Sequence, residues 1–208
     1  MKKLIKFLSV EKILVENPIS QEPIEKLLRK RNWDQVLERI ILNLELNEKT
    51  TCEDTILHSV CRNYPPVRVV NRILIEFSWL ASQLNEEKQT PLHVAAACGA
   101  SPKVVAALVK HCPESSEWQD NEGCTPLHLH LKYSPLCDAG YMYQKEDNPT
   151  LIKGPMMQIL EELVEAMSIE SMMIKDKTRH TALMVAVAVG ANPAVVEFLK
   201  DATPAIKW

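Results

Sequence analysis

Glycine is scarce in this sequence, with 5 residues in 208, about a third of the share of about 7% that is usual in proteins. Glycine adopts positive φ without strain, and hairpins, bulges and phosphate-binding loops often need such residues. A sequence with so few glycines is therefore expected to contain few of these turns. Aromatic residues make up only 5%, which argues against a β-sandwich or barrel. Both shortages favour a helical protein.

The sequence also lacks a strong net charge, a long apolar run and a metal-binding cysteine motif. The formal net charge is −3, so we expect no nucleic-acid partner. We find no run of 18 apolar residues and therefore expect no membrane span. The cysteines include no C-x-x-C pair, so we expect neither metal nor cofactor. Since we recognise no secretory signal, we expect the cysteines to be free thiols in the cytoplasm or the nucleus.

A repeat is present instead. Four segments begin alike: TILHSVCRNY from Thr55, TPLHVAAACG from Thr90, TPLHLHLKYS from Thr125 and TALMVAVAVG from Thr181. Their threonines are 35, 35 and 56 residues apart. Threonine is a good N-cap, and the proline that follows it in two copies suits a first helical turn. Gly99 and Gly190 lie nine residues after their threonines, where a left-handed residue ends a helix.

A second apolar pattern follows each threonine segment. Val104-Val105-x-x-Leu108-Val109 is one copy, and this spacing predicts the inner face of a short helix. An earlier helix pair, Ile24 to Arg31 and Val36 to Ile41, lacks the threonine and fits an N-terminal cap. Each unit is therefore a helix pair that must bury its apolar faces against its neighbours.

Two of the units closely resemble ankyrin repeats. The matching residues are Thr90-Pro91-Leu92-His93-x-Ala95-Ala96-x-x-Gly99 and Asp120-x-x-Gly123-x-Thr125-Pro126-Leu127-His128. The resemblance covers residues 22–201 and implies an all-α solenoid of stacked helix pairs with short fingers between the units. It also implies structural roles, through hydrogen bonds at the helix starts and to the neighbouring unit. The residues that carry the motif are Thr55, His58, Thr90, Pro91, His93, Gly99, Thr125, Pro126, His128, Thr181 and Gly190.

Departures from the ankyrin pattern lead to further predictions. Glu53, Lys88 and Arg179 stand where Gly123 provides the finger glycine. We expect their fingers to be less regular turns than ideal hairpins. Met184 stands where the last unit should have histidine, in keeping with terminal repeats, one face of which meets solvent.

The chain divides into an N-terminal helical extension, residues 1–21, and a repeat domain, residues 22–208. The longest threonine spacing holds about 20 extra residues, which fall between the two helices of the third threonine unit, at about 133–155. Long loops are commonly functional or disordered, and tyrosine is a favoured contact residue. Tyr141 and Tyr143 are therefore candidates for partner binding, and an unselected surface loop is the alternative.

His130 occupies a position that holds small residues in the other units. Together with His128 it invites a zinc interpretation, but residues i and i+2 on a helix point to different faces. We expect His130 to be packed and hydrogen-bonded to the insertion.

The sequence contains no recognisable catalytic motif, and the ankyrin resemblance implies reversible protein binding without a reaction. We predict a non-enzymatic scaffold, adaptor or inhibitor that acts as a monomer and binds a protein partner through its concave face and fingers. The predicted contacts on the fingers are Glu86, Glu87, Lys88, Gln89, Asn121, Glu122, Lys177, Thr178 and Arg179. Those on the first helices are Arg62, Asn63, Cys98, Lys132 and Tyr133.

Two alternatives remain open. One is an enzyme that uses the thiol of Cys98 or Cys137 with a nearby histidine. The other is a peripheral membrane-associated ankyrin protein that is anchored by a basic N-terminal segment. Residues 1–32 contain eight Lys or Arg and four Asp or Glu, but packing of this segment on the stack is the better interpretation.

Overall fold

The computed structural model describes residues 22–41, 54–133 and 154–203. Within these ranges the chain is all-helical, with ten α-helices and no strand. The helices are α2 (Ile24–Arg29), α3 (Trp33–Ile41), α4 (Ile56–Arg62), α5 (Val67–Glu76), α6 (Pro91–Cys98), α7 (Pro102–His111), α8 (Pro126–Tyr133), α9 (Pro155–Glu165), α10 (Ala182–Ala188) and α11 (Pro193–Ala202).

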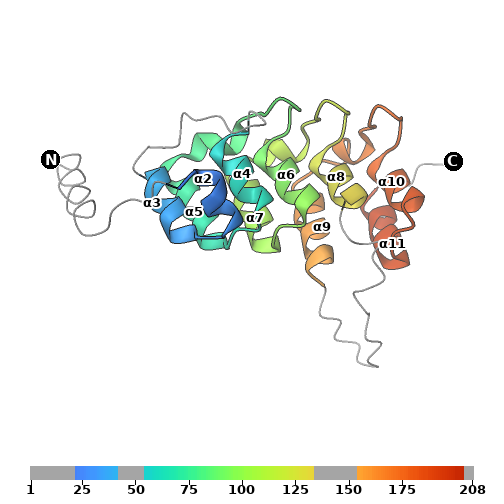
Figure 1. Cartoon of the computed structure of the whole chain (residues 1–208). Helices are drawn as coiled ribbons and strands as arrows, with labels where there is room; N and C mark the ends of the chain where they lie inside the picture. Colours follow the sequence, from blue (N-terminus) through green and yellow to red (C-terminus); the bar gives the residue numbers. More distant parts are fainter. Residues whose placement is uncertain (1–21, 42–53, 134–153, 204–208) are drawn as a thin grey trace, which may run out of the picture.

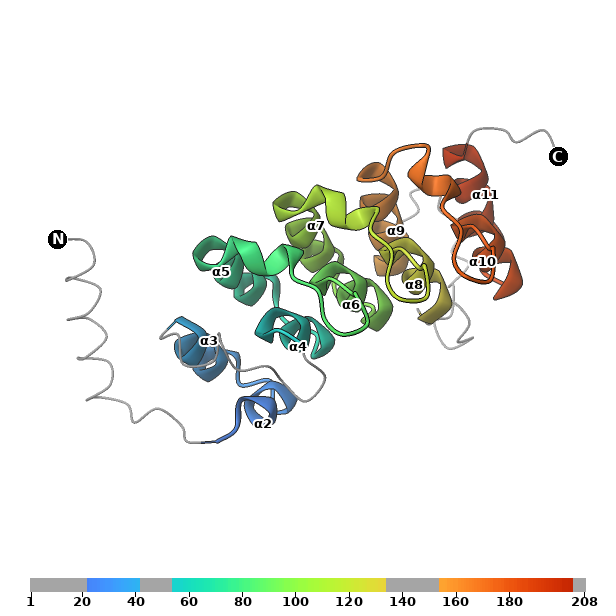
Figure 2. The ribbon, with the colours of Figure 1, turned by 90° about the horizontal axis from the view of Figure 1, so that it is seen from above.

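The ten helices form a stack of five pairs (Figure 1). Seen from above, α2, α4, α6, α8 and α10 form one row and α3, α5, α7, α9 and α11 form the other (Figure 2). We call these rows the inner and the outer helices. The loops that join α5 to α6, α7 to α8 and α9 to α10 project together at one edge of the stack (Figure 1). These loops are the fingers predicted from the sequence.

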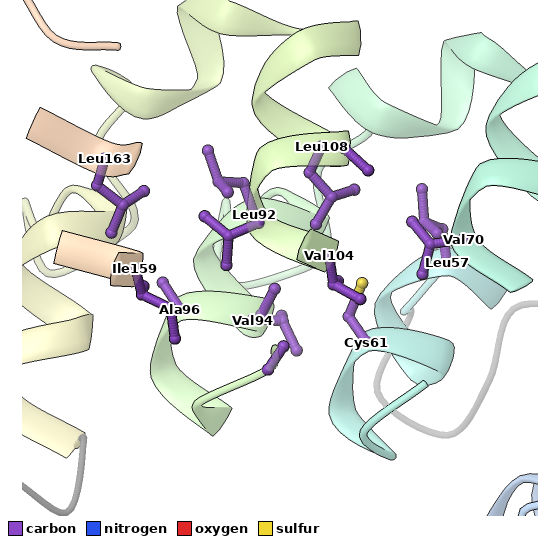
Figure 3. Packing of buried hydrophobic residues seen from close by; sticks show 14 of the residues in the cluster. Leu57, Cys61, Val70, Leu92, Val94, Ala96, Val104, Leu108, Ile159 and Leu163 are labelled. Atoms are coloured by element: carbon purple, nitrogen blue, oxygen red, sulfur yellow. The ribbon is translucent and has the colours of Figure 1, made fainter. Parts of the chain in front are cut away.

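The core lies between the two rows and runs from unit to unit. Leu57 and Leu92 of the inner helices are at most 1% exposed, and so are Leu108 and Leu163 of the outer helices. Figure 3 shows these side chains, which come from three consecutive units, in the space between the helices. A single short helix pair could not enclose them, so the burial of each unit depends on its neighbours.

Threonine and histidine together fix the start of each middle inner helix. The backbone N–H of Thr90 donates to His93 Nδ1 at 3.1 Å, and the N–H of His93 donates to Thr90 Oγ1 at 3.3 Å. Since Nδ1 accepts, the neutral ring carries its proton on Nε2. Nε2 lies 3.0 Å from the carbonyl oxygen of Trp118 and 3.3 Å from that of Cys124, both near the following finger.

The same contact recurs in the units on either side. His58 Nε2 lies 2.8 Å from the carbonyl oxygen of Gln89, and His128 Nε2 lies 3.2 Å from that of His180. Burial lowers the pKa of His93 to about 4 and also lowers the pKa values of His58 and His128. All three rings are therefore neutral near pH 7 and tie each unit to the next one.

The fingers are more regular than predicted. Lys88 and Arg179 have φ of 57° and 66°, close to the 74° of Gly123. The N–H of each donates to the carbonyl oxygen three residues earlier, at 3.0 Å for Lys88, 2.9 Å for Gly123 and 2.8 Å for Arg179. The prediction of irregular fingers at Lys88 and Arg179 is therefore wrong, whereas Glu53 lies outside the described residues.

A side-chain acceptor explains why these fingers need no glycine. Asn85 Oδ1 accepts the N–H groups of Glu87 and Gln89 at 3.1 and 2.8 Å. Asp176 Oδ1 likewise accepts the N–H of His180 at 2.9 Å. These bonds hold the turn closed and offset the cost of about 1–2 kcal/mol that a left-handed conformation imposes on a residue with a Cβ.

The ends of several elements differ from the predictions. Helix α2 ends at Arg29, two residues before the predicted end, and Arg31 takes a φ of 55°. Tyr133 and Pro155, which the sequence places in the insertion, are the last residue of α8 and the first residue of α9. The chain between them, residues 134–153, lies outside the described ranges, as do residues 1–21.

Three short 3-10 helices, which the repeat pattern does not predict, connect outer helices to fingers. They are η1 (Ser78–Ser82), η2 (Pro113–Ser116) and η4 (Ser171–Met173). In η2, Ser116 Oγ donates to the carbonyl oxygens of Pro113 at 2.7 Å and of Ala166 at 3.1 Å. The second bond joins this connection to the end of α9, so the connections also contribute to contacts between units.

Candidate functional site

A hollow of about 480 Å³ opens between the fingers and α8. Its floor includes Leu129 and Cys124, which are 3% and 1% exposed. Tyr133, at the end of α8, is 66% exposed and forms part of the wall. Seven of the predicted contact residues line this hollow: Glu87, Gln89, Asn121, Glu122, Thr178, Lys132 and Tyr133.

Hydrogen bonds between neighbouring fingers give the hollow a fixed wall. The N–H of Asn121 donates to the carbonyl oxygen of Glu87 at 2.9 Å, and its Nδ2 donates to that of Glu86 at 2.9 Å. The N–H of Lys177 donates to the carbonyl oxygen of Glu122 at 2.9 Å. Three successive fingers are thus connected through their backbones, which holds their side chains at fixed spacings.

A partly buried ion pair lines the hollow. Lys132 Nζ donates to Asp176 Oδ2 at 2.9 Å and to Cys124 Sγ at 3.1 Å. Burial alone would lower the pKa of Lys132, but the bonds to Asp176 and Cys124 hold it above its ordinary value. Burial alone would raise the pKa of Asp176, but the bonds from Thr178, Lys132 and His180 hold it well below its ordinary value. Both groups are therefore charged at neutral pH.

The other predicted contacts do not line the hollow. Arg62 forms an ion pair with the buried Asp54, with 2.9 Å between Nη2 and Oδ2. Asn63 donates from Nδ2 to the carbonyl oxygen of Ser59 at 2.8 Å, and Cys98 is half-buried at the end of α6. Glu86, Lys88, Lys177 and Arg179 are exposed on the fingers, while Tyr141 and Tyr143 lie outside the described residues.

Four residues that line the hollow were not predicted from the sequence, namely Asp120, Cys124, Leu129 and Asp176. A usable pattern was present, because Asn85, Asp120 and Asp176 each stand five residues before a repeat threonine. The side chain at this position organises its own finger and faces the preceding unit. To predict this role one must know which residues of adjacent units are in contact, and the spacing of residues in the sequence does not show this.

His130 is buried between two units. Its Nδ1 lies 3.2 Å from the carbonyl oxygen of Ala96, and its Nε2 lies 3.3 Å from that of Met156. The prediction of a packed histidine therefore needs one correction, since both partners belong to helices, α6 and α9, rather than to the insertion. Burial lowers the pKa of His130. No group of three His, Cys, Asp or Glu side chains in the described ranges is arranged to hold a metal ion.

Three of the four thiols in the described part of the chain are not activated. Burial raises the pKa values of Cys61, Cys98 and Cys124, whereas a nucleophilic cysteine needs a lowered pKa. The proposed thiol chemistry at Cys98 thus receives no support, and Cys137 lies outside the described residues. Over the same ranges, no helix combines the length and apolar character needed to cross a bilayer.

Comparison with known proteins agrees with this geometry. A family model described as ankyrin repeats (3 copies) matches residues 29–112, a stretch that extends from the last residue of α2 to the residue after α7. A search of curated proteins finds no matching sequence. Beyond the matched stretch, α8 to α11 continue the same stack of helix pairs (Figure 1).

Proposed function

Since the chain is an ankyrin repeat protein, and ankyrin repeats are generally protein-interaction modules without catalytic activity, we propose that it binds a protein partner through its fingers and inner helices. Its role is that of a scaffold, adaptor or inhibitor. The observation that carries this proposal is the hollow of about 480 Å³ between the fingers and α8, beside the exposed ring of Tyr133.

The composition of the hollow suits a recognition site. Tyrosine beside a concave surface is a favoured anchor for protein partners, because its ring buries a large area at a small cost in side-chain entropy. Tyr133 is 66% exposed and can gain much of that burial on binding. The backbone bonds between the fingers leave little of the wall to be ordered when a partner binds, which favours affinity.

The proposed contacts fall into a centre and a rim. The centre consists of the seven predicted residues that line the hollow, with Asp120, Cys124, Leu129 and Asp176 added from the structure. The rim consists of Glu86, Lys88, Lys177 and Arg179 on the exposed parts of the fingers. Arg62, Asn63 and Cys98 extend the surface along α4 and α6. Rim contacts usually contribute less to affinity than buried central ones.

Site-specific photo-crosslinking tests the proposal. A photoreactive phenylalanine analogue replaces Tyr133 in the full chain, and the matched control carries the same group at Ile75, which is 71% exposed on the outer helix α5. We expect a discrete adduct with one protein from position 133 and none from position 75. Adducts from position 75 alone, or the same proteins from both positions, would contradict the proposed face.

We also propose that the protein works as a monomer in the cytosol or the nucleus. The four cysteines of the described ranges, Cys61, Cys98, Cys112 and Cys124, are free thiols, which a reducing compartment maintains. Light scattering coupled to size exclusion tests the monomer. The membrane-anchored alternative depends on residues outside the described ranges, and co-sedimentation with vesicles, with and without residues 1–18, tests it.

A further inference from the structure

One position of the inner helices alternates between a cation and alanine. The residue seven places after each threonine is Arg62 in α4, Ala97 in α6 and Lys132 in α8. In α4 and in α8 the basic side chain forms an ion pair with a buried carboxylate, Asp54 or Asp176. The two carboxylates occupy different positions, because Asp54 directly precedes the threonine of the same unit whereas Asp176 lies in the following finger, so the pair of Lys132 and Asp176 is the one to compare with the unit of α6.

The unit of α6 has a carboxylate equivalent to Asp176 but no basic residue equivalent to Lys132. Asp120, in the finger that follows α6 and α7, is only 8% exposed. Its Oδ1 accepts the N–H groups of Glu122 and Cys124 at 2.9 and 2.8 Å. Among the residues that the structure describes, its Oδ2 accepts only from the neutral amide of Gln89, at 3.3 Å. No Lys or Arg side chain of the described residues pairs with Asp120.

The equivalent carboxylate of the next finger shows the difference. Asp176 Oδ2 receives Lys132 Nζ at 2.9 Å, from the helix position that Ala97 fills in the preceding unit. The methyl side chain of Ala97 carries no charge, so it cannot form an ion pair with Asp120. The space next to Asp120 forms part of the hollow, so a basic group can reach this carboxylate from outside.

The charge of the hollow is strongly one-sided. Its lining contains four carboxylates, Glu87, Asp120, Glu122 and Asp176, and one cation, Lys132, which is already paired with Asp176. The side chain of Glu122 has a distant partner in Lys177, at 3.8 Å, with both groups well exposed. The other carboxylates of the lining therefore add to the negative electrostatic potential near Asp120, which favours a cation there.

We propose that this hollow binds an arginine side chain presented by the protein partner. The inference rests on the proposed function and names the chemistry that the partner must supply. The guanidinium lies beside Asp120 and Glu87, where it takes the place toward Asp120 that Lys132 Nζ takes toward Asp176. Its flat face stacks on the exposed ring of Tyr133. Arginine fits better than lysine, because its planar group combines paired N–H bonds to a carboxylate with stacking on an aromatic ring.

A matched pair of peptides probes the hollow directly. One short glycine–serine peptide carries a single arginine, and the other carries citrulline, which has the same shape without the charge. Each is titrated into the full isotopically labelled chain and followed by nuclear magnetic resonance. We expect saturable shifts at Asp120, Glu122 and Tyr133 with the arginine peptide, weaker shifts at higher salt, and no saturation with the citrulline peptide.

Two substitutions separate binding from folding. Ala97→Lys supplies the missing cation from within the stack, so we expect a fold at least as stable as the original and at least about tenfold weaker binding of the arginine peptide. Asp120→Asn keeps the finger, because Asn85 closes the equivalent finger with its own Oδ1; it should also weaken binding. Glu165→Gln, at the end of the outer helix α9, removes one negative charge elsewhere and should leave binding unchanged.

Three results would overturn the proposal. The first is equal binding of the arginine and citrulline peptides, and the second is unchanged binding to the Ala97→Lys variant. The third is peptide binding that occurs only after Lys145 and Lys153 are replaced by Gln, because the insertion of this chain would then occupy the hollow. If the crosslink from position 133 persists in the Ala97→Lys variant at full yield, the arginine proposal fails while the proposed protein-binding function stands.

Discussion

The second threonine unit, α6 and α7, and the last unit, α10 and α11, have the same sequence pattern but different neighbours. His93 of the second unit is bonded to carbonyl groups near the following finger, and Ala96 is fully buried. The equivalent residues of the last unit are Met184 and Val187, and Val187 is 59% exposed. Among the described units, the histidine of the motif is thus present where a following unit supplies a carbonyl group that it can contact.

The largest expected effect comes from removing that bond. We expect His93→Ala to lower the free energy of unfolding by about 3 kcal/mol, because it leaves two buried carbonyl groups and the N–H of Thr90 without this partner. Met184→Ala in the last unit should cost about 1 kcal/mol, since only apolar contact is lost at a half-buried site. Urea unfolding of the two variants makes the comparison, and equal losses would contradict the role assigned to the histidine.

Low pH should lower the stability of the middle units, because the same buried histidines are neutral in the folded protein. The pKa of His93 is about 4 in the folded protein and 6.5 in the unfolded chain, so the unfolded state binds more protons between these values. Stability is therefore complete above about pH 6.5 and falls as the pH drops toward 4, by about 2 kcal/mol from His93 between pH 7 and pH 5. Urea midpoints across this range test the slope, while an unchanged midpoint would speak against buried neutral rings.

The fingers should show smaller effects of opposite sign. Gly123→Ala places a Cβ 3.0 Å from the backbone nitrogen of Lys177 at a φ of 74°, so we expect a loss of about 1–2 kcal/mol. Lys88→Gly relieves a left-handed residue, which stabilises the fold, but glycine also increases the entropy of the unfolded chain, which offsets part of this effect, so we expect a net gain of about 0.5 kcal/mol. Thermal unfolding measures both. A loss on Lys88→Gly would show that its side chain contributes more than its backbone costs.

Much of the fold is predictable from the sequence, because local rules decide it. The threonines at helix starts and Pro102 and Pro193 at the starts of α7 and α11 lie where capping chemistry predicts them. Gly99 ends α6 with a φ of 67°, as its place in the repeat indicates. The fingers were mispredicted, since a rule based on glycine overlooks the side-chain oxygens of Asn85 and Asp176.

The site is predictable only in part. Residues that point outward from a finger, such as Glu87 and Asn121, are recognisable because the repeat pattern leaves them free to vary. Asp120 and Asp176 were missed, since each has a local role in its own finger and a second role toward the preceding unit, where Asp120 accepts from Gln89 of the preceding finger and Asp176 accepts from Lys132 of α8. This second role depends on contacts between residues more than 20 positions apart, which follow from the packing of units and not from any short motif.

Hydrogen–deuterium exchange of the full chain, alone and bound to the protein recovered through position 133, tests the binding face most directly. We predict slower exchange on binding in the finger residues 86–89 and 119–124 and at the end of α8, with no change in the outer helices α5 and α7. Protection confined to the outer helices, or the absence of any protection in the fingers, would contradict the claim that the hollow is the centre of a protein-binding surface.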